Sequence, residues 1–418
     1  MKKSFLFPLV VLLLLAACTP KKTETKVAYG EATQQLVALV EQNPDLKAQL
    51  QKSIEMAKQI NPDTTTNPAQ TLEDYYGTFS MMETAMPWTL LKKDKVNVFD
   101  DIMQGFCSTY FIIDQPLPEL EGKGYFRNSL QYAQPFAGWM TQFNKSWGKY
   151  LDTESSWNDS YYQLVLNDPM FGLQNGWYED PSHWKTFNQF FARHLSSPAA
   201  RPIASPDDDA VVAAFADSEP QGVWAVDASS NLLESAAVKS ATVNSVSELL
   251  GTDNPYKDAF ANGTFMHSFL NVNDYHRYHF SMSGTVKDAR IINGINPSGG
   301  TLEWIADEKR YRFTPASVGW QMLETRGVVI LETPKYGLVA LVPIGMAVVG
   351  SVNFEESVKP GAVVKKGDPL GWFAFGGSDF ILVFQDKVKF ELQAPKNDSG
   401  SGYKHMLMGE RLGAVKRK

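Results

Sequence analysis

The two parts of the chain on either side of about residue 207 favour different secondary structure. After this point, short apolar and β-branched runs alternate with Gly, Pro and Asp turns, and the clearest runs occupy residues 211–215, 286–292, 327–331 and 338–342. Before it, residues 72–183 are rich in Trp, Tyr, Phe and Asn and contain no long β-branched run. We therefore expect an α+β protein, with an N-terminal helical extension followed by a β-rich domain.

The helical extension carries three local signals. A helix should begin near Asn43-Pro44, because proline suits a first helical turn and Leu46, Leu50 and Ile54 then share one face. Residues 139–147 should form an amphipathic helix whose aromatic stripe packs in a core rather than forming a binding face. Residues 61–68 contain two Pro and three consecutive Thr, which indicates a linker. These signals divide the chain into residues 18–68, a helical region 69–186 and a domain 187–418.

The N-terminus has the pattern of an export signal. Two lysines precede an apolar run at residues 5–15, which is too short to span a bilayer and ends at Ala16-Ala17-Cys18. A cysteine after small residues is typical of a bacterial lipoprotein signal, so residues 1–17 should be removed and Cys18 lipidated. We expect a periplasm-facing lipoprotein of the cell envelope, anchored to the membrane through Cys18; the alternative is a chance cysteine in an ordinary signal peptide.

The net charge argues against a nucleic-acid-binding protein, and the cysteine content argues against an intrachain disulfide. The net charge of −7 argues against nucleic-acid binding, which needs clustered Lys and Arg. The chain has only two cysteines, so lipidation of Cys18 leaves Cys107 without a disulfide partner. Because Cys107 stands among aromatic and apolar residues, we expect a buried, unreactive thiol.

Three clusters of polar residues could carry chemistry. Asp217 ends an apolar strand, and three of the six histidines, His267, His276 and His279, fall within thirteen residues. Their spacing matches no zinc motif, so no metal is expected, whereas imidazoles suit acid–base catalysis; a packing role is the alternative. The third cluster, Gly376-Gly377-Ser378, precedes an apolar run and by itself would indicate only a hairpin turn.

Taken together, these clusters resemble the pyruvoyl-dependent phosphatidylserine decarboxylase family, from about Phe187 to the C-terminus. Each family motif has a counterpart in the chain. Phe-Phe-x-Arg and Arg-Pro-Ile match residues 190–193 and 201–203, Pro-Ala-Asp-Gly resembles residues 215–218, Asp-Tyr-His-Arg-x-His matches residues 274–279, and the Gly-Gly-Ser-Thr cleavage site resembles residues 376–379.

The chain departs from the family pattern at three places. Ser218 replaces Gly, Asp379 replaces the Thr after the cleavage serine, and Phe280-Ser281 replaces the Pro after the second histidine. None of these changes removes a group that carries chemistry. Asp379 lies beside the scissile bond and could alter the rate of self-cleavage.

The resemblance implies that the protein cuts itself between Gly377 and Ser378. Ser378 would attack the Gly377 carbonyl, with His279 as general base and Asp217 orienting the imidazole. The cofactor would be a pyruvoyl group made from Ser378, which binds the substrate amine and accepts electrons as CO₂ leaves. His276 would return a proton to the product, or else pack or position substrate. The small chain, residues 378–418, should stay attached because its first strand is buried.

The resemblance favours conversion of phosphatidylserine to phosphatidylethanolamine and CO₂, a step of phospholipid biosynthesis. A free amino acid such as tryptophan is the alternative substrate, because relatives with a similar extension include aromatic amino-acid decarboxylases. A second alternative is a non-enzymatic binding lipoprotein, since residues 364–371 resemble half of a lipoyl-carrier hairpin. The expected partners are the substrate, the membrane and the two chains of one precursor; a homo-oligomer is left open.

Overall fold

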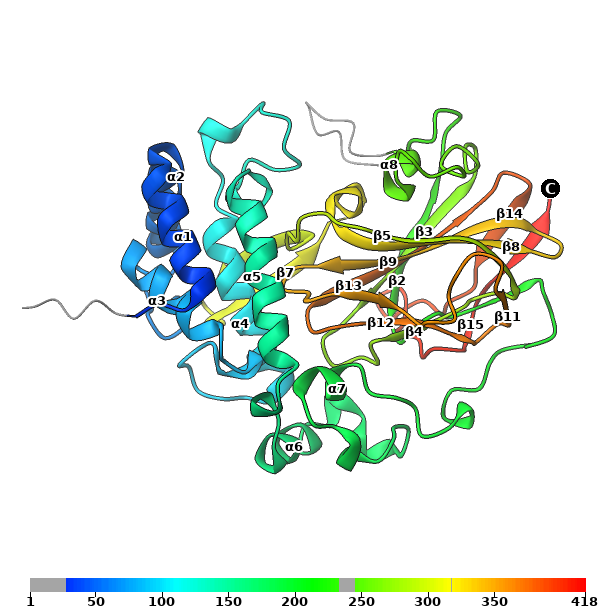
Figure 1. The fold of residues 1–418 in the computed structure, drawn as a ribbon, viewed down its shortest axis with the longest axis horizontal. Helices are drawn as coiled ribbons and strands as arrows, with labels where there is room; N and C mark the ends of the chain where they lie inside the picture. Colours follow the sequence, from blue (N-terminus) through cyan, green and yellow to red (C-terminus); the bar gives the residue numbers. More distant parts are fainter. Residues whose placement is uncertain (1–27, 233–244, 317) are drawn as a thin grey trace, which may run out of the picture.

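The computed structural model describes residues 28–232, 245–316 and 318–418, and it joins a helical region to a β-rich region (Figure 1). This arrangement confirms the predicted α+β fold. Cys18 and the predicted signal peptide lie outside the described residues. The helices are α1 (Glu31–Gln42), α2 (Pro44–Ile60), α3 (Leu72–Met82), α4 (Val98–Ile113), α5 (Phe136–Leu151), α6 (Asp159–Leu166), α7 (Phe187–Phe191) and α8 (Val246–Leu250).

Local sequence accounts for where several helices begin. Pro44 occupies the first turn of α2, as predicted, and the side chains of Leu46, Leu50 and Ile54 are buried. The side chain of Asn97 accepts a hydrogen bond from the backbone N–H of Asp100 and caps α4. Helix α5 contains the predicted amphipathic segment, and its aromatic residues are buried in the core as expected.

The predicted linker at residues 61–68 is wrong, because this segment is an ordered turn. Asn67 and Thr66 are buried, and Asn61 Nδ2 donates to the hydroxyl of Tyr311 over 2.9 Å. That hydroxyl in turn donates to Thr66 O over 3.1 Å. The polar residues that suggested a solvated linker instead satisfy buried hydrogen bonds between the helical region and a distant strand. Residues on both sides of the turn, Leu50 among them, belong to one apolar core.

In the described ranges, fifteen strands follow α7, and each of the four predicted runs coincides with one of them, although β1 covers only the first three residues of the run 211–215. The strands are β1 (Val211–Ala213), β2 (Glu219–Ala225), β3 (Thr264–Leu270), β4 (Arg277–His279), β5 (Gly284–Ile292), β6 (Gly300–Ile305), β7 (Arg310–Pro315), β8 (Thr325–Thr333), β9 (Gly337–Met346), β10 (Val352–Phe354), β11 (Val363–Val364), β12 (Pro369–Phe373), β13 (Gly377–Phe384), β14 (Val388–Leu392) and β15 (Arg411–Arg417).

One seven-stranded sheet organises the β-rich region. Its strand order is β11-β5-β8-β9-β13-β3-β2, and smaller sheets comprise β1-β15-β14, β10-β12-β4 and β6-β7. Strand β13 pairs antiparallel with β9 on one side and with β3 on the other. The first strand of the predicted small chain therefore lies inside the sheet, as expected.

Strand β13 has an apolar core on each face. Phe380 points to one face, where its ring lies 4.1 Å from that of Phe215 and 5.5 Å from that of Tyr278. Ile381 points to the other face and joins a core with α8 and Trp320. The helical region packs against the end of the sheet at which β13 begins, and Phe375 belongs to the helical core (Figure 1).

The helices also bear on membrane crossing and on the reactivity of Cys107. Within the described ranges, no helix is both long and apolar enough to cross a membrane. Cys107 on α4 is buried, and burial raises the pKa of its thiol to about 12. This raised pKa keeps the thiol protonated at neutral pH, which fits the predicted unreactive role.

Candidate active site

Ser378, the predicted nucleophile, is the second residue of β13 and is fully buried. It stands opposite Leu270 on β3 and Gly345 on β9. Because side chains alternate along a strand, Ser378 shares the face of Phe380, which is the face covered by Phe215 and Tyr278. Its Oγ has no hydrogen-bond partner among the described residues, so the contact expected between Ser378 and the general base His279 is not formed.

The two glycines before Ser378 allow a close approach of two backbone segments. Gly376 has φ +149°, and a Cβ there would lie 2.2 Å from the Val349 backbone. A Cβ on Gly377 would lie 2.9 Å from Met346 Cγ. Only glycine fits this packing at position 376. At position 377, the lack of a side chain leaves room around the carbonyl that Ser378 would attack.

His276 is buried immediately before β4, and its ring stacks on that of Phe191 at 3.8 Å. Phe191 in turn contacts Phe375, which directly precedes the two glycines, at 5.3 Å. Nδ1 of His276 lies 2.9 Å from Asp274 O, so this nitrogen carries the proton. Nε2 has no partner among the described residues, and burial, with the charge of Arg193, holds the pKa of His276 well below its usual value. His276 is therefore a neutral imidazole with a free lone pair.

His279 lies at the end of β4 with both ring nitrogens engaged. Nδ1 is 2.9 Å from Gly367 O and must donate to it, while Nε2 is 3.1 Å from the hydroxyl of Tyr275 and accepts from it. Burial lowers the pKa of His279 to about 4. The imidazole is neutral, but the nitrogen that a general base would use is occupied by Tyr275.

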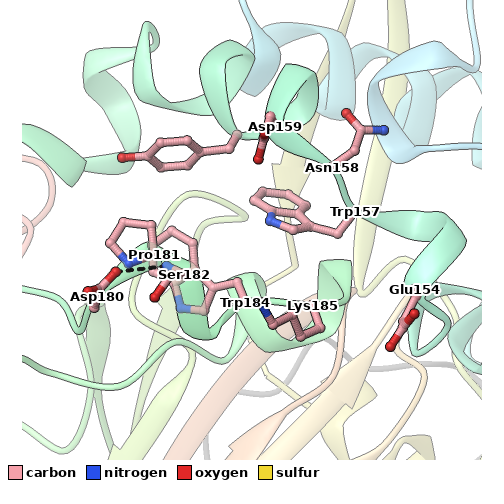
Figure 2. Close-up of a pocket in the computed structure, with 10 residues that line it drawn as sticks. Glu154, Trp157, Asn158, Asp159, Asp180, Pro181, Ser182, Trp184 and Lys185 are labelled. Atoms are coloured by element: carbon pink, nitrogen blue, oxygen red, sulfur yellow. Dashed lines mark hydrogen bonds between the residues drawn. The ribbon is translucent and has the colours of Figure 1, made fainter.

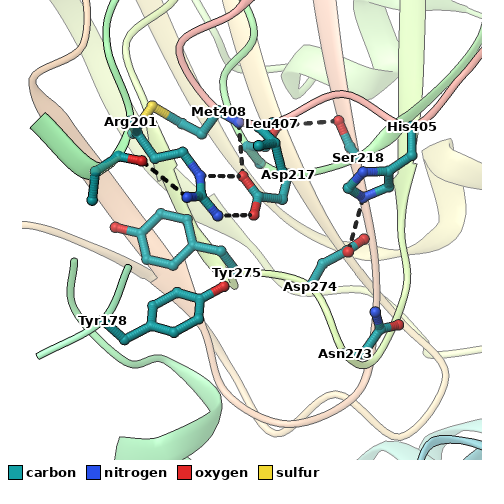
Figure 3. Close-up of polar contacts among 12 residues, drawn as sticks. Tyr178, Arg201, Asp217, Ser218, Asn273, Asp274, Tyr275, His405, Leu407 and Met408 are labelled. Carbon is teal, nitrogen blue, oxygen red and sulfur yellow. Dashed lines mark hydrogen bonds and ion pairs between the residues drawn. The ribbon is translucent and has the colours of Figure 1, made fainter. Parts of the chain in front are cut away.

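Asp217 follows β1 and is bound by Arg201 (Figure 3). Its carboxylate accepts from Arg201 Nε at 3.1 Å and Nη2 at 2.7 Å, and from the backbone N–H of Met408 at 2.7 Å. The expected hydrogen bond between Asp217 and His279 is not formed among the described residues. The reason is that the guanidinium supplies two charge-assisted bonds and engages both carboxylate oxygens.

The histidine cluster predicted from sequence is divided between two faces of the sheet. Nδ1 of His267 lies 2.7 Å from Asp379 Oδ2, and both side chains occupy the face opposite Ser378. Burial raises the pKa of Asp379 and of nearby Glu324, whose carboxylate has no hydrogen-bond partner among the described residues. The change from Thr to Asp379 was visible in the sequence, but its pairing with His267 was not.

Several site residues were not assigned a role from sequence. Tyr275 lies in the motif that supplies His276 and His279, and Arg201 lies in the Arg-Pro-Ile motif, but neither motif predicts a role for these two residues. His405, from the predicted small chain, lies 2.9 Å from Asp274 (Figure 3). Burial opposes protonation of His405, but the hydrogen bond to Asp274 raises its pKa above the usual value. No sequence pattern signalled this contact.

Cavities adjoin these residues. Arg201, Tyr275 and His279 line one cavity of about 520 Å³. Asp217 and His405 line another of about 430 Å³, which shares Phe99, Glu219 and Asn271 with a third cavity of about 490 Å³ beneath α4 and β7. We call these two adjoining cavities the cleft. Asn271 follows Leu270, the strand partner of Ser378, but neither Ser378 nor His276 lines the cleft.

A separate pocket of about 680 Å³ lies in the helical region beside α6 (Figure 2). Trp157, Tyr162 and Trp184 form its aromatic walls, and Lys185 lies at its edge. None of the predicted catalytic residues lines this pocket, whereas Asp217 lines the cleft and His279 lines the cavity beside Arg201 and Tyr275. No group of three or more His, Cys, Asp or Glu side chains in the described part of the chain could hold a metal ion.

Comparisons match the C-terminal part of the chain to known proteins. The family model for phosphatidylserine decarboxylase matches residues 187–414. Phosphatidylserine decarboxylase proenzyme 2 of Oryza sativa subsp. japonica is 36% identical over 65% of the chain and 40% of its own length. Decarboxylase iboD of Amanita muscaria is 31% identical over 48% of the chain and 58% of its own length. A Chlamydia trachomatis phosphatidylserine decarboxylase proenzyme is 31% identical over 56% of the chain and 71% of its own length.

The chain thus spans about two fifths of the rice relative and somewhat more than half of the Amanita relative. The family match covers more than half of the chain and contains Asp217, His276, His279 and Ser378. The helical region before residue 187 lies outside that match. On this match, the chain belongs to the phosphatidylserine decarboxylase family, a family of carboxy-lyases.

Proposed function

We propose that the chain is a self-processing, pyruvoyl-dependent decarboxylase. The observation that carries this proposal is the state of Ser378. Its buried hydroxyl has no partner in the described ranges, and the residue follows two glycines that pack closely against residues 346–349. The neutral imidazoles of His276 and His279 lie just before and at the end of β4, whose Tyr278 packs against Phe380 on the face of the sheet that Ser378 shares. A serine held in this way is suited to react with its own backbone.

Self-cleavage proceeds by an acyl shift followed by elimination. Ser378 Oγ adds to the carbonyl carbon of Gly377 while a base takes the hydroxyl proton, and the Ser378 nitrogen leaves with a proton, giving an ester. Removal of the Ser378 Cα proton then breaks the Cβ–O bond and releases the Gly377 carboxylate. The dehydroalanine left on residue 378 tautomerises, and water replaces ammonia to give a pyruvoyl group at the new N-terminus.

The two histidines have distinct proposed roles. His279 takes the hydroxyl proton of Ser378, which requires Nε2 to exchange Tyr275 for Ser378. Asp217 acts on His279 through its charge, because Arg201 holds its carboxylate. His276, whose Nε2 is free, holds or delivers the proton that the product carbon needs.

The residues at the start of β13 fit the proposed pyruvoyl group. Residue 378 is fixed between β3 and β9, so a group formed there stays in place after the chain is cut. When present, this group supplies an electron sink for loss of CO₂ from an amine-bearing substrate. The chain's own residues exclude water around residue 378 and supply neutral imidazoles for proton transfer.

Phosphatidylserine is the substrate that we propose first. The family and the rice and Chlamydia relatives are named for it. A lipid on Cys18 would place the site next to phospholipid, at the periplasmic face of the cell envelope, and the product would be phosphatidylethanolamine.

A free amino acid is the second candidate, because the cleft is partly walled by the helical extension. Phe99 of α4 and the aromatic residues Phe171, Trp177 and Tyr178 line it. These side chains precede the matched domain and could enclose a small substrate. The Amanita relative is named a decarboxylase, without mention of a phospholipid.

An assay of CO₂ release tests the proposal. The purified chain is supplied with phosphatidylserine vesicles or with free serine and tryptophan, and Ser378→Ala serves as the matched control. CO₂ release from one substrate by the parent chain and none by the variant supports the proposal and names the substrate. Equal background release from every substrate by both proteins would contradict it.

A further inference from the structure

The segment that leads into the cleavage site is held by the helical extension. Phe375 is buried three residues before Ser378, and its ring contacts Trp147 of α5 at 5.4 Å. The same ring contacts Phe187 and Phe191 of α7, each at 5.3 Å. The scissile strand therefore begins inside an aromatic cluster that the extension helps to build.

Asn188 on α7 connects this segment to α5 by hydrogen bonds. Its Oδ1 accepts from the backbone N–H of Phe375 over 2.9 Å. Its Nδ2 donates to Gly148 O over 3.1 Å and to Asp152 Oδ1 over 2.9 Å. Asn188 is buried, and its amide donors and carbonyl acceptor are all used between α5 and the backbone near the cleavage site. A buried, fully bonded amide of this kind fixes the relative position of the groups it joins.

A second contact between α5 and the site involves the turn after β9. Asn144 Nδ2 donates to Ala347 O over 3.1 Å. Gly350 N donates to Phe375 O over 3.0 Å. Gly148 and Gly350 approach so closely that a Cβ on Gly148 would lie 3.0 Å from Gly350 Cα. Helix α5 therefore supports both the segment before Ser378 and the turn against which that segment packs.

We propose that the helical extension positions the Gly377–Ser378 bond for self-cleavage, with Asn188 as the positioning residue that links α5 to the cleavage segment. This inference rests on the proposed self-processing. The attack of Ser378 on Gly377 requires the hydroxyl and the carbonyl to meet at a defined angle, and small displacements of such pairs slow reactions steeply. Asn188 takes no part in proton transfer; it acts through the backbone of Phe375.

The test measures the rate of self-cleavage in freshly translated chains by mass spectrometry. Asn188→Leu removes all three hydrogen bonds. Asn188→Asp keeps the acceptor for Phe375 but loses both donors and faces Asp152 with a like charge; adding Asp152→Asn restores a donor between the two positions. Asn67→Leu is the control, because Asn67 is buried in the helical region and donates to Asn61 O over 2.9 Å, away from the cleavage segment.

We expect cleavage about 10- to 100-fold slower in Asn188→Leu and Asn188→Asp, and faster in the double variant than in Asn188→Asp. Hydroxylamine, which cleaves the ester intermediate, should release less small chain from the slow variants. Asn67→Leu should cleave at the parent rate even if its melting temperature falls. A general loss of stability would slow the control as well and would not be reversed by Asp152→Asn.

The outcomes separate this inference from the proposed function. Folded Asn188→Leu that cleaves within twofold of the parent rate would overturn the inference alone. If Asn188→Leu does not fold, equal rates for Asn188→Asp and the double variant would overturn it. A parent chain that never cleaves would overturn the proposed function and this inference with it.

Discussion

The hydroxyl of Tyr275 lies 3.1 Å from Nε2 of His279 and donates to it. Since Nδ1 of the same ring donates to Gly367 O, Tyr275 occupies the only lone pair with which His279 could act as a base. In the uncleaved chain, both ring nitrogens of His279 are therefore engaged by groups other than Ser378. The base role that we propose for His279 requires this hydrogen bond to be exchanged for one with Ser378.

Tyr275→Phe removes the competing donor while keeping the ring that packs beside His279. We expect self-cleavage at least as fast as in the parent chain, because Nε2 becomes free to accept the Ser378 proton. The measurement is the cleavage rate of the variant at several pH values. Slower cleavage in a folded variant would show instead that the Tyr275 hydroxyl takes part in proton transfer.

Substitutions of His279 and His276 should block different steps, self-cleavage and decarboxylation respectively. His279→Gln removes the proposed base, so the chain should remain uncleaved. His276→Gln should cleave but release CO₂ at least about tenfold more slowly than the parent, since it lacks the proposed proton donor. Mass spectrometry and CO₂ release, measured on the same samples, separate the steps. The reverse pattern would assign the base role to His276, whose Nε2 is already free.

The ion pair between Arg201 and Asp217 should matter for stability, because its side chains are only 1% and 4% exposed. Arg201→Met leaves a buried carboxylate without its partner and should lower the free energy of unfolding by about 3–5 kcal/mol. Arg312→Met, which removes a half-exposed pair with Glu308, should lower it by no more than about 1 kcal/mol. Urea unfolding in a Ser378→Ala background measures both, and equal losses would contradict the assignment.

Stability should fall as the solution becomes acidic, and His279 should contribute to the fall. Its pKa is about 4 in the folded chain, against an ordinary value near 6.5 in the unfolded chain. Above pH 6.5 neither state binds the proton; between 6.5 and 4 only the unfolded state gains it, so folding loses stability over that window. His276, also lowered by burial, acts in the same direction.

His279→Gln isolates this contribution in the Ser378→Ala background. The free energy of unfolding is measured from pH 8 to pH 4 for both proteins. The loss on acidification should be smaller in the variant, by at most about 3 kcal/mol. Parallel curves over the whole range would show that the pKa of His279 is not lowered in the folded chain.

Much of the fold could be predicted from the sequence because it depends on local patterns. Pro44 marks the start of α2, and the apolar run after Ser378 forms a strand inside the sheet. The ordered turn at residues 61–68 could not be predicted, since the groups that satisfy its polar atoms include Tyr311, some 250 positions away.

The sequence could point to candidate site residues but not to their contacts. Motif resemblance found Asp217 and the histidines, yet the choice of Arg201 over His279 as the partner of Asp217 depends on three-dimensional competition for one carboxylate. His267 looked like a third member of the cluster. The alternation of side chains along paired strands places it instead on the face opposite Ser378, with Asp379.

The central claim is that Ser378 cuts the chain at its own N-terminal side. Intact mass spectrometry of the purified protein, beside Ser378→Ala and with a carbonyl reagent added, tests it most directly. The account predicts a small chain of residues 378–418 that binds the reagent in the parent sample, and a single uncut chain in the variant. One uncut chain in both samples, or a small chain that persists in Ser378→Ala, would contradict it.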